Sequence, residues 1–157
     1  MVFRIRKLLD EEDTFWLFAL IVESYLPPDF YVDMYGATTH ATILVRIFEQ
    51  YNILPLVLQK FDKMQYPIIN LSCQFFLSLF TICLPESESL KVLDLFLLEG
   101  MKSNKLIFDV TLAYLRILQK QIIDCQNFNT VIDPTNKAFE DPSILMIEIK
   151  RARLQLK

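Results

Sequence analysis

Residues 71–100 read LSCQFFLSLFTICLPESESLKVLDLFLLEG, two apolar stretches separated by Pro85. The first stretch contains four polar residues and is shorter than the roughly 20 consecutive apolar residues that a bilayer-spanning helix needs. We therefore predict a buried helix over residues 73–84, for which Ser72 supplies the N-cap. Pro85 ends this helix because proline cannot continue the backbone hydrogen-bond pattern.

The second apolar stretch has start and stop signals at its two ends. Glu86 and Glu88 lie in the first turn, where carboxylates interact favourably with the helix dipole. Gly100 follows the last apolar residues and can adopt the left-handed conformation that commonly ends a helix. We predict this helix over residues 86–99, joined to the preceding one by a tight turn.

Apolar residues recur at helical spacing through the rest of the chain. One predicted helix is capped by Asp10 or an acidic neighbour and ends at Pro27; because it is apolar on nearly all sides, we expect it to be central and contacted on several faces. Another begins near Pro55, which the first turn of a helix tolerates. The other predicted elements are residues 39–51, residues 104–125, a short element that includes Phe139, and a final helix after Asp141-Pro142-Ser143. The chain is therefore predicted to be all-α, with about seven or eight helices.

The composition limits what such a domain can do. The 157 residues are enough for one domain with one hydrophobic core. The two glycines, Gly36 and Gly100, are too few for the glycine-rich loops that hold phosphates. The net charge of −3 gives no positive field, so we expect no nucleic-acid partner. The 53% apolar share exceeds the usual ~45–50%, and we expect association with another chain through exposed apolar surface.

The cysteines and the single histidine do not form a recognisable site. Cys73, Cys83 and Cys125 are an odd set without Cys-x-x-Cys spacing, which favours buried thiols in a reducing, cytoplasmic setting. The N-terminus lacks the apolar stretch of a signal peptide. His40 has no ligand-type neighbours, so we expect an exposed or capping residue near a helix start rather than a metal ligand or catalytic base. No metal site and no cofactor site are predicted.

The charged clusters also have structural explanations. The run Glu11-Glu12-Asp13 and the pair Glu86 and Glu88 both lie at predicted helix starts, where capping and the helix dipole account for them. The terminal group Lys150, Arg151, Arg153 and Lys157 is expected to be a solvated face, the alternative being contact with an acidic membrane surface or a partner. The residues alone therefore predict a helical domain with no catalytic residue of its own.

Three stretches share their order and spacing with one known family. They are EEDTFWL followed by LPPDFY within residues 11–31, FFLSLF followed by Leu-Pro within residues 75–85, and KVLDLFLLEG at residues 91–100. Together they resemble the C-terminal half of the Rab GTPase-activating TBC domain, over about residues 8–125. Phe75 and Leu93 stand where that family usually has tryptophan. Within the third stretch, Asp94, Glu99 and Gly100 match the family directly. We expect Asp94 to be a structural carboxylate with its hydrogen bonds satisfied rather than a catalytic group.

The resemblance implies a function and also a gap. TBC domains accelerate GTP hydrolysis on Rab proteins with an arginine from an Ile-x-x-Asp-x-x-Arg motif and a glutamine from a Tyr-x-Gln motif. None of the six arginines follows an aspartate by three places, and no tyrosine precedes a glutamine by two. The family places both motifs before the Glu-Glu-Asp run, which only ten residues precede here. We therefore expect the non-catalytic half of a TBC domain, with residues 1–9 as a lead-in, 10–125 as the TBC-like region and 126–157 as a C-terminal extension.

Three functions remain open at this level. The first is part of a GTPase activator in vesicle trafficking, with a Rab-family GTPase as partner and no activity from this chain alone. The second is a non-catalytic helical module that binds a small GTPase or a scaffold. The third is an unrelated helical protein. For the first two we expect a cytoplasmic protein, at most peripheral to endomembranes, whose apolar surface contacts the missing N-terminal half or another chain.

Overall fold

The computed structural model describes residues 1–27, 29–100 and 105–156, and within these ranges the protein is all-α. The α-helices are α1 (Val2–Ile5), α2 (Glu11–Leu20), α3 (Tyr35–Gln50), α4 (Pro55–Lys63), α5 (Ile68–Ser78), α6 (Glu86–Glu99), α7 (Leu106–Ile117), α8 (Gln119–Asp124) and α9 (Ile144–Gln155). Single turns are η1 (Ile21–Tyr25, a π-helix), η2 (Val32–Met34), η4 (Phe128–Thr130) and η5 (Lys137–Phe139). The predicted all-α class is confirmed.

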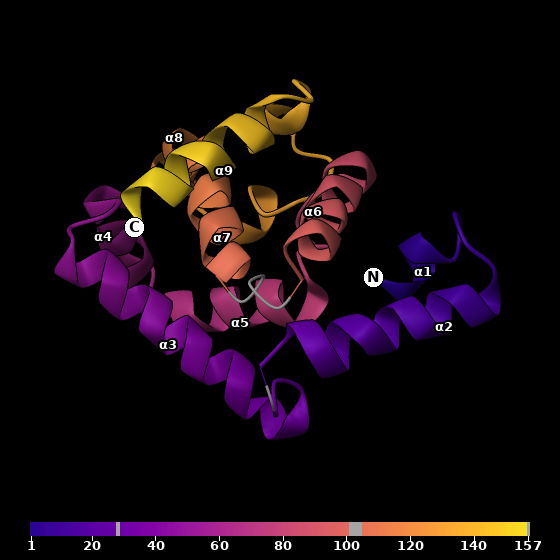
Figure 1. Cartoon of the computed structure of the whole chain (residues 1–157). Coiled ribbons are helices and arrows are strands. Elements are labelled where there is room, and N and C mark those ends of the chain that lie inside the picture. Colours follow the sequence, from indigo (N-terminus) through magenta and orange to yellow (C-terminus); the bar gives the residue numbers. More distant parts are fainter. Residues whose placement is uncertain (28, 101–104, 157) are drawn as a thin grey trace.

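Helix α7 lies at the centre of the molecule, surrounded by α5, α6 and α9 (Figure 1). Aromatic side chains fill the space around it. The Tyr114 ring meets Phe75 of α5 edge-on at 5.0 Å and stacks on Phe139 of η5 at 5.5 Å. Farther along, Phe61 of α4 stacks on Phe128 of η4 at 4.4 Å. The predicted short element that includes Phe139 thus closes the core.

Several helix bounds follow the sequence signals. Helix α6 covers the predicted residues 86–99, and Gly100 has φ of +53° at its end. Pro55 is the first residue of α4, and α9 begins after Asp141-Pro142-Ser143 as predicted. Helix α3 begins at Tyr35, four residues before the predicted start at Thr39. The agreements at the proline- and glycine-marked ends arise because these residues restrict the backbone locally.

The prediction for residues 73–84 is wrong at both ends. Helix α5 begins directly after Pro67 and stops at Ser78, because Leu79 and Phe80 adopt left-handed conformations with φ of 46° and 64°. Ser72, predicted as the cap, is buried inside the helix. The turn that follows places both Leu79 and Phe80 in the core. Side-chain burial therefore outweighs the helical propensity of this stretch.

The predicted helix 104–125 is divided into two. Position 104 lies outside the described residues, and the helix breaks at Leu118, which has φ of −92° and ψ of 2°. Leu118 and Ile122 are both buried, and the change of direction lets α8 pack on α4. A straight helix could not make this contact while α7 remains between α5 and α9.

The helix predicted after Asp10 has the predicted cap but not the predicted surroundings. The backbone N–H of Asp13 donates to Asp10 Oδ1 at 2.9 Å. Helix α2 then gives way to the π-helix η1, which ends before Pro27. The expectation of a central helix is wrong: α1 and α2 project from the rest of the molecule (Figure 1), and Thr14 is the one buried residue of α2. Few elements contact α2, so Phe15, Trp16 and Leu20 remain exposed to solvent.

Length and apolar content also bear on membrane insertion. Within the described residues, no single helix is both long enough and apolar enough to cross a bilayer. Val32–Gln50 and Pro55–Lys63 reach that length and composition only when counted together, and they are bent by 119° at their junction.

Candidate protein-interaction surface

Helices α1 and α2, residues 2–20, form an arm that exposes several large apolar side chains beside its charged ones. Phe15 and Trp16 are 61% and 62% exposed, and their rings meet edge-on at 5.2 Å. Other exposed large apolar side chains of the arm are Val2, Phe3, Leu8, Leu9 and Leu20. Scattered apolar residues are normal on a protein surface, but exposed Phe and Trp side chains in contact with each other are of the kind that is enriched at interfaces.

The arm is attached firmly at its base. The Arg4 guanidinium donates hydrogen bonds to the backbone carbonyl oxygens of Leu84 (3.2 Å) and Pro85 (3.1 Å), and also to the Thr81 carbonyl and the Ser89 hydroxyl. The Thr81 and Leu84 carbonyls lie in the turn between α5 and α6, whereas the Pro85 carbonyl also accepts from the Ser89 N–H at the start of α6. Lys7 pairs with Glu86 at 2.8 Å. The exposed face of the arm is therefore held in a defined direction.

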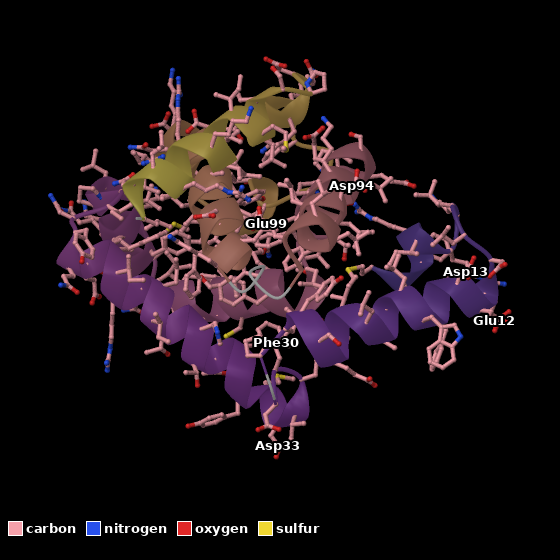
Figure 2. All side chains as sticks on the ribbon, in the orientation of Figure 1. Glu12, Asp13, Phe30, Asp33, Asp94 and Glu99 are labelled. Atoms are coloured by element: carbon pink, nitrogen blue, oxygen red, sulfur yellow. The ribbon has the colours of Figure 1, made fainter. Side chains whose placement is uncertain are left out.

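The charge along the chain is uneven. Residues 8–45 contain seven acidic residues and no Lys or Arg, whereas residues 46–157 contain 12 acidic and 13 basic residues. The acidic segment covers α2, η1, η2 and most of α3. Glu12 and Asp13 lie together at the far end of α2, and Asp33 lies apart from them at the turn before α3, all three on the outside of the molecule (Figure 2). A partner for this side of the molecule would need basic groups.

The residues of the third resembling stretch have structural roles that differ from the prediction. Asp94 is exposed and has no hydrogen-bond or ion-pair partner among the described residues, so the expected satisfied carboxylate is wrong. Glu99 instead pairs with Arg153 of α9. A side chain added at Gly100 would lie 3.7 Å from the ring of Tyr25. Glu99 and Gly100 thus lie where α6 meets α9 and η1, and Figure 2 shows Glu99 toward the centre of the molecule and Asp94 away from it.

Arg153 links α9 to a second carboxylate, on α7. Its Nε lies 3.3 Å from Asp109 Oδ2, and the Asp109 side chain is 3% exposed. Burial raises the pKa of Asp109 to about 6, although the positive charges of Arg153 and Lys105 act against this shift. Oδ1 of Asp109 has no hydrogen-bond partner among the described atoms. The Asp109 carboxyl is thus costly to ionise, and Arg153 reduces that cost.

The terminal basic group is therefore only in part the solvated face that we predicted. Lys150 and Arg151 are exposed, and Arg151 pairs with Glu148 on its own helix. Arg153 points inward to the two carboxylates described above. Lys157 lies outside the described residues.

His40 is also placed differently from the prediction. It is half-buried on α3, and its ring lies 5.9 Å from the rings of both Phe30 and Phe108. Its Nδ1 is 2.8 Å from the carbonyl oxygen of Gly36. The residue packs α3 against its neighbours rather than standing exposed or capping the helix.

The other candidates from the sequence are dispersed. The thiols of Cys73, Cys83 and Cys125 are free, and burial raises the pKa of Cys83 well above its usual range. Glu86 pairs with Lys7, while the buried Glu88 pairs with Lys91 at 2.7 Å. Across the part of the chain that the structure describes, no three His, Cys, Asp or Glu residues are grouped to hold a metal ion. The exposed arm is the most distinctive surface.

The family model for the Rab-GTPase-TBC domain matches residues 2–123. Small G protein signaling modulator 3 of Homo sapiens is 27% identical over 143 residues, which are 88% of this chain and 18% of that protein. The same protein of Bos taurus is 28% identical over 148 residues, 91% of this chain and 19% of the relative.

A more distant relative is a putative GTPase-activating protein of Emericella nidulans, 27% identical over 131 residues, 83% of this chain and 11% of that protein. The chain thus spans about a fifth or less of the length of these curated relatives. No solved structure matches the chain.

Proposed function

The chain belongs to the Rab-GTPase-TBC domain family, and we propose that it forms the C-terminal, non-catalytic part of a domain that stimulates GTP hydrolysis by Rab GTPases. Members of this family regulate GTPases. We assign residues 10–125 to the TBC region and residues 126–157 to a C-terminal extension. The observation that carries the proposal is the family match over residues 2–123, together with the three motif stretches in family order.

The proposal includes no activity for this chain alone. An arginine supplied in trans stabilises the charge that develops on the transferring phosphoryl group and is worth about 10³–10⁵ in rate. The sequence has neither the Ile-x-x-Asp-x-x-Arg motif nor the Tyr-x-Gln motif. Arg4 and Arg153, the arginines with the richest contacts, are occupied by carbonyl groups and carboxylates of the chain itself. We therefore propose that the fingers come from another polypeptide segment.

The arm is the surface that this segment would cover. Phe15 and Trp16 belong to the first family-like stretch. Both are large apolar side chains, which are usually buried, yet both are exposed to solvent. Covering the two rings would remove a large apolar area from water, at roughly 25 cal/mol per Å². The attachment through Arg4 supports this proposal because it presents the face in a fixed orientation.

Single-turnover GTP hydrolysis by a panel of GTP-loaded Rab proteins tests the proposal. We expect the chain alone to leave the rates unchanged and to accelerate one or more of them when mixed with a TBC-family polypeptide that carries both finger motifs. Phe15→Ser with Trp16→Ser should abolish the acceleration by the mixture, whereas Leu98→Ser, at an exposed apolar residue of α6, should not. Acceleration by the chain alone of about a hundredfold or more, approaching the ~10³–10⁵ of an arginine finger, would contradict the proposal.

The second candidate function is a helical module that binds a small GTPase or a scaffold without catalysis. The exposed apolar arm favours it as well, since such a surface needs a protein partner whether or not hydrolysis follows. A measurement of Rab binding alongside the hydrolysis assay separates the two functions. Binding of a Rab protein without acceleration, in the presence of the finger-bearing polypeptide, would favour the binding module.

A further inference from the structure

A second exposed apolar surface lies at the turn between η1 and α3, away from the end of the arm. We call residues 29–35 the knuckle. Val32, Met34 and Tyr35 are exposed there, Tyr35 to 73%. Figure 2 shows Asp33 at the tip of this turn, whereas Phe30 points back into the molecule and Glu12 and Asp13 lie at the far end of α2. Three large apolar side chains are thus presented on a projecting turn.

The knuckle is held in one conformation by close backbone contacts. Asp33 and Met34 are left-handed, with φ of 49° and 57°, which costs an L-residue of this kind roughly 1–2 kcal/mol. A Cβ at Gly36 would lie 2.5 Å from the Cα of Phe30, so that glycine alone permits the approach. The Gly36 N–H donates to the Asp29 carbonyl at 3.3 Å, and Phe30 is buried. Because the turn is already ordered, binding through it loses little conformational entropy.

A hollow of about 360 Å³ adjoins the knuckle. Its walls combine apolar side chains with two exposed carboxylates, those of Glu23 and Asp29, and Val32 of the knuckle lies on its rim. Neither carboxylate has a partner among the described residues. An apolar hollow with two unpaired carboxylates suits a Lys or Arg side chain, whose aliphatic stem packs on apolar walls while its charged end meets the carboxylates.

The charge around the knuckle selects among possible occupants. A second copy of the chain would bring two acidic segments of residues 8–45 together, and like charges across an interface are unfavourable. An anionic membrane would repel Glu23, Asp29 and Asp33 for the same reason. A folded protein with a basic side chain next to an apolar surface meets both requirements.

We propose that the knuckle docks on the Rab-family GTPase, with a Lys or Arg of the GTPase in the Glu23–Asp29 hollow and apolar residues of the GTPase against Met34 and Tyr35. This inference rests on the proposed function for its partner and adds to it a specific contact surface and the charge of the complementary site. The knuckle and the arm then serve two different contacts.

Binding of the chain to a panel of Rab GTPases loaded with a non-hydrolysable GTP analogue tests this surface. Two variants alter it: Met34→Ser with Tyr35→Ser, and Glu23→Lys. Each has a matched control on α6, Leu98→Ser for the apolar change and Asp94→Lys for the charge reversal, because Leu98 is 82% exposed and Asp94 is exposed and unpaired among the described residues. We expect the knuckle variants to bind about tenfold or more weakly, and the controls to stay within about twofold of the unchanged chain.

Each outcome bears on one of the two proposals. Equal binding by the knuckle variants and their controls would overturn this inference and leave the proposed function intact. A chain that binds none of the GTPases would overturn this inference, whereas the hydrolysis assay with the finger-bearing polypeptide decides the proposed function separately. Dimer formation or binding to phosphatidylserine vesicles that disappears in the Met34→Ser, Tyr35→Ser variant would assign the knuckle to a different occupant and overturn the inference. Circular dichroism of each variant checks that the fold is retained.

Discussion

Helices α2 and α7 are both rich in large apolar residues, yet their surroundings are opposite. Nine of the twelve residues of α7 are buried, whereas one of the ten residues of α2 is. Helix α7 is covered by α5, α6, α8 and α9 of the same chain, while α2 is contacted mainly by α1 and η1. The difference shows that an apolar helix sequence predicts a covering partner for the helix. It does not indicate whether that partner is part of the same chain or of another one.

The largest expected effect is a cavity next to α7. Phe75→Ala removes a fully buried ring that contacts Tyr114 and Phe80, and should lower the free energy of unfolding by ~3–5 kcal/mol. Urea unfolding followed by circular dichroism measures it. A decrease in the free energy of unfolding of less than ~1 kcal/mol would contradict the tight packing of α5 on α7, and with it the contrast to α2.

The second-largest effect is expected from removing the Arg153 guanidinium, which pairs with Asp109 of α7. Arg153→Met leaves Asp109 without its ion-pair partner, and we expect about 3 kcal/mol of destabilisation at neutral pH, at the lower end of values for broken buried pairs because Arg153 is partly exposed. The loss should be smaller near pH 5, where Asp109, with a pKa of about 6, is mostly protonated. Arg151→Met is the matched control on the exposed side of α9. A loss that does not change with pH would contradict this account.

The carboxyl of Asp109 itself should give a pH dependence of known sign. Its folded pKa of about 6 lies above the ordinary value of 3.8, so the unfolded state holds fewer protons between these values and stability falls as pH rises through them. Asp109→Asn removes this titration. From pH 4 to pH 7.5, the unfolding free energy of the variant should rise relative to the unchanged chain by roughly 2–3 kcal/mol. A constant difference, or one of opposite sign, would refute the raised pKa.

The smallest effect is expected on the arm. Trp16→Ser should change the unfolding free energy of the isolated chain by less than ~0.5 kcal/mol, because the ring is 62% exposed. The same substitution should strongly weaken association with the finger-bearing polypeptide, measured by isothermal titration calorimetry. A large loss of stability in the isolated chain would show that α2 is buried like α7, and would remove the contrast between the two helices.

The parts of the fold that could be predicted are those with local causes. Gly100 ends α6 and Pro55 begins α4 through their own backbone restrictions, and Asp10 caps α2 through a neighbouring N–H. The end of α5 could not be predicted, because Leu79 and Phe80 leave the helix to enter a core formed by distant elements.

The candidate surfaces follow the same division. The acidic character of residues 8–45 is evident in the sequence, but the exposure of Phe15 and Trp16 is not, and we predicted the reverse. The roles of Arg4 and Arg153 depend on groups about 80 and 50 positions away in the chain, beyond any local pattern. Contacts of this kind become visible only when the helices are placed.

The sequence by itself determined the all-α class, the bounds of α6 and the family resemblance, because helical periodicity, capping and motif order are properties of neighbouring residues. Only the tertiary structure decided which apolar helix is covered, which arginines face inward, and that the knuckle projects. The physical reason is that burial depends on what lies opposite a face. A repeat of 3.6 residues marks the apolar face of a helix and carries no information about what covers it.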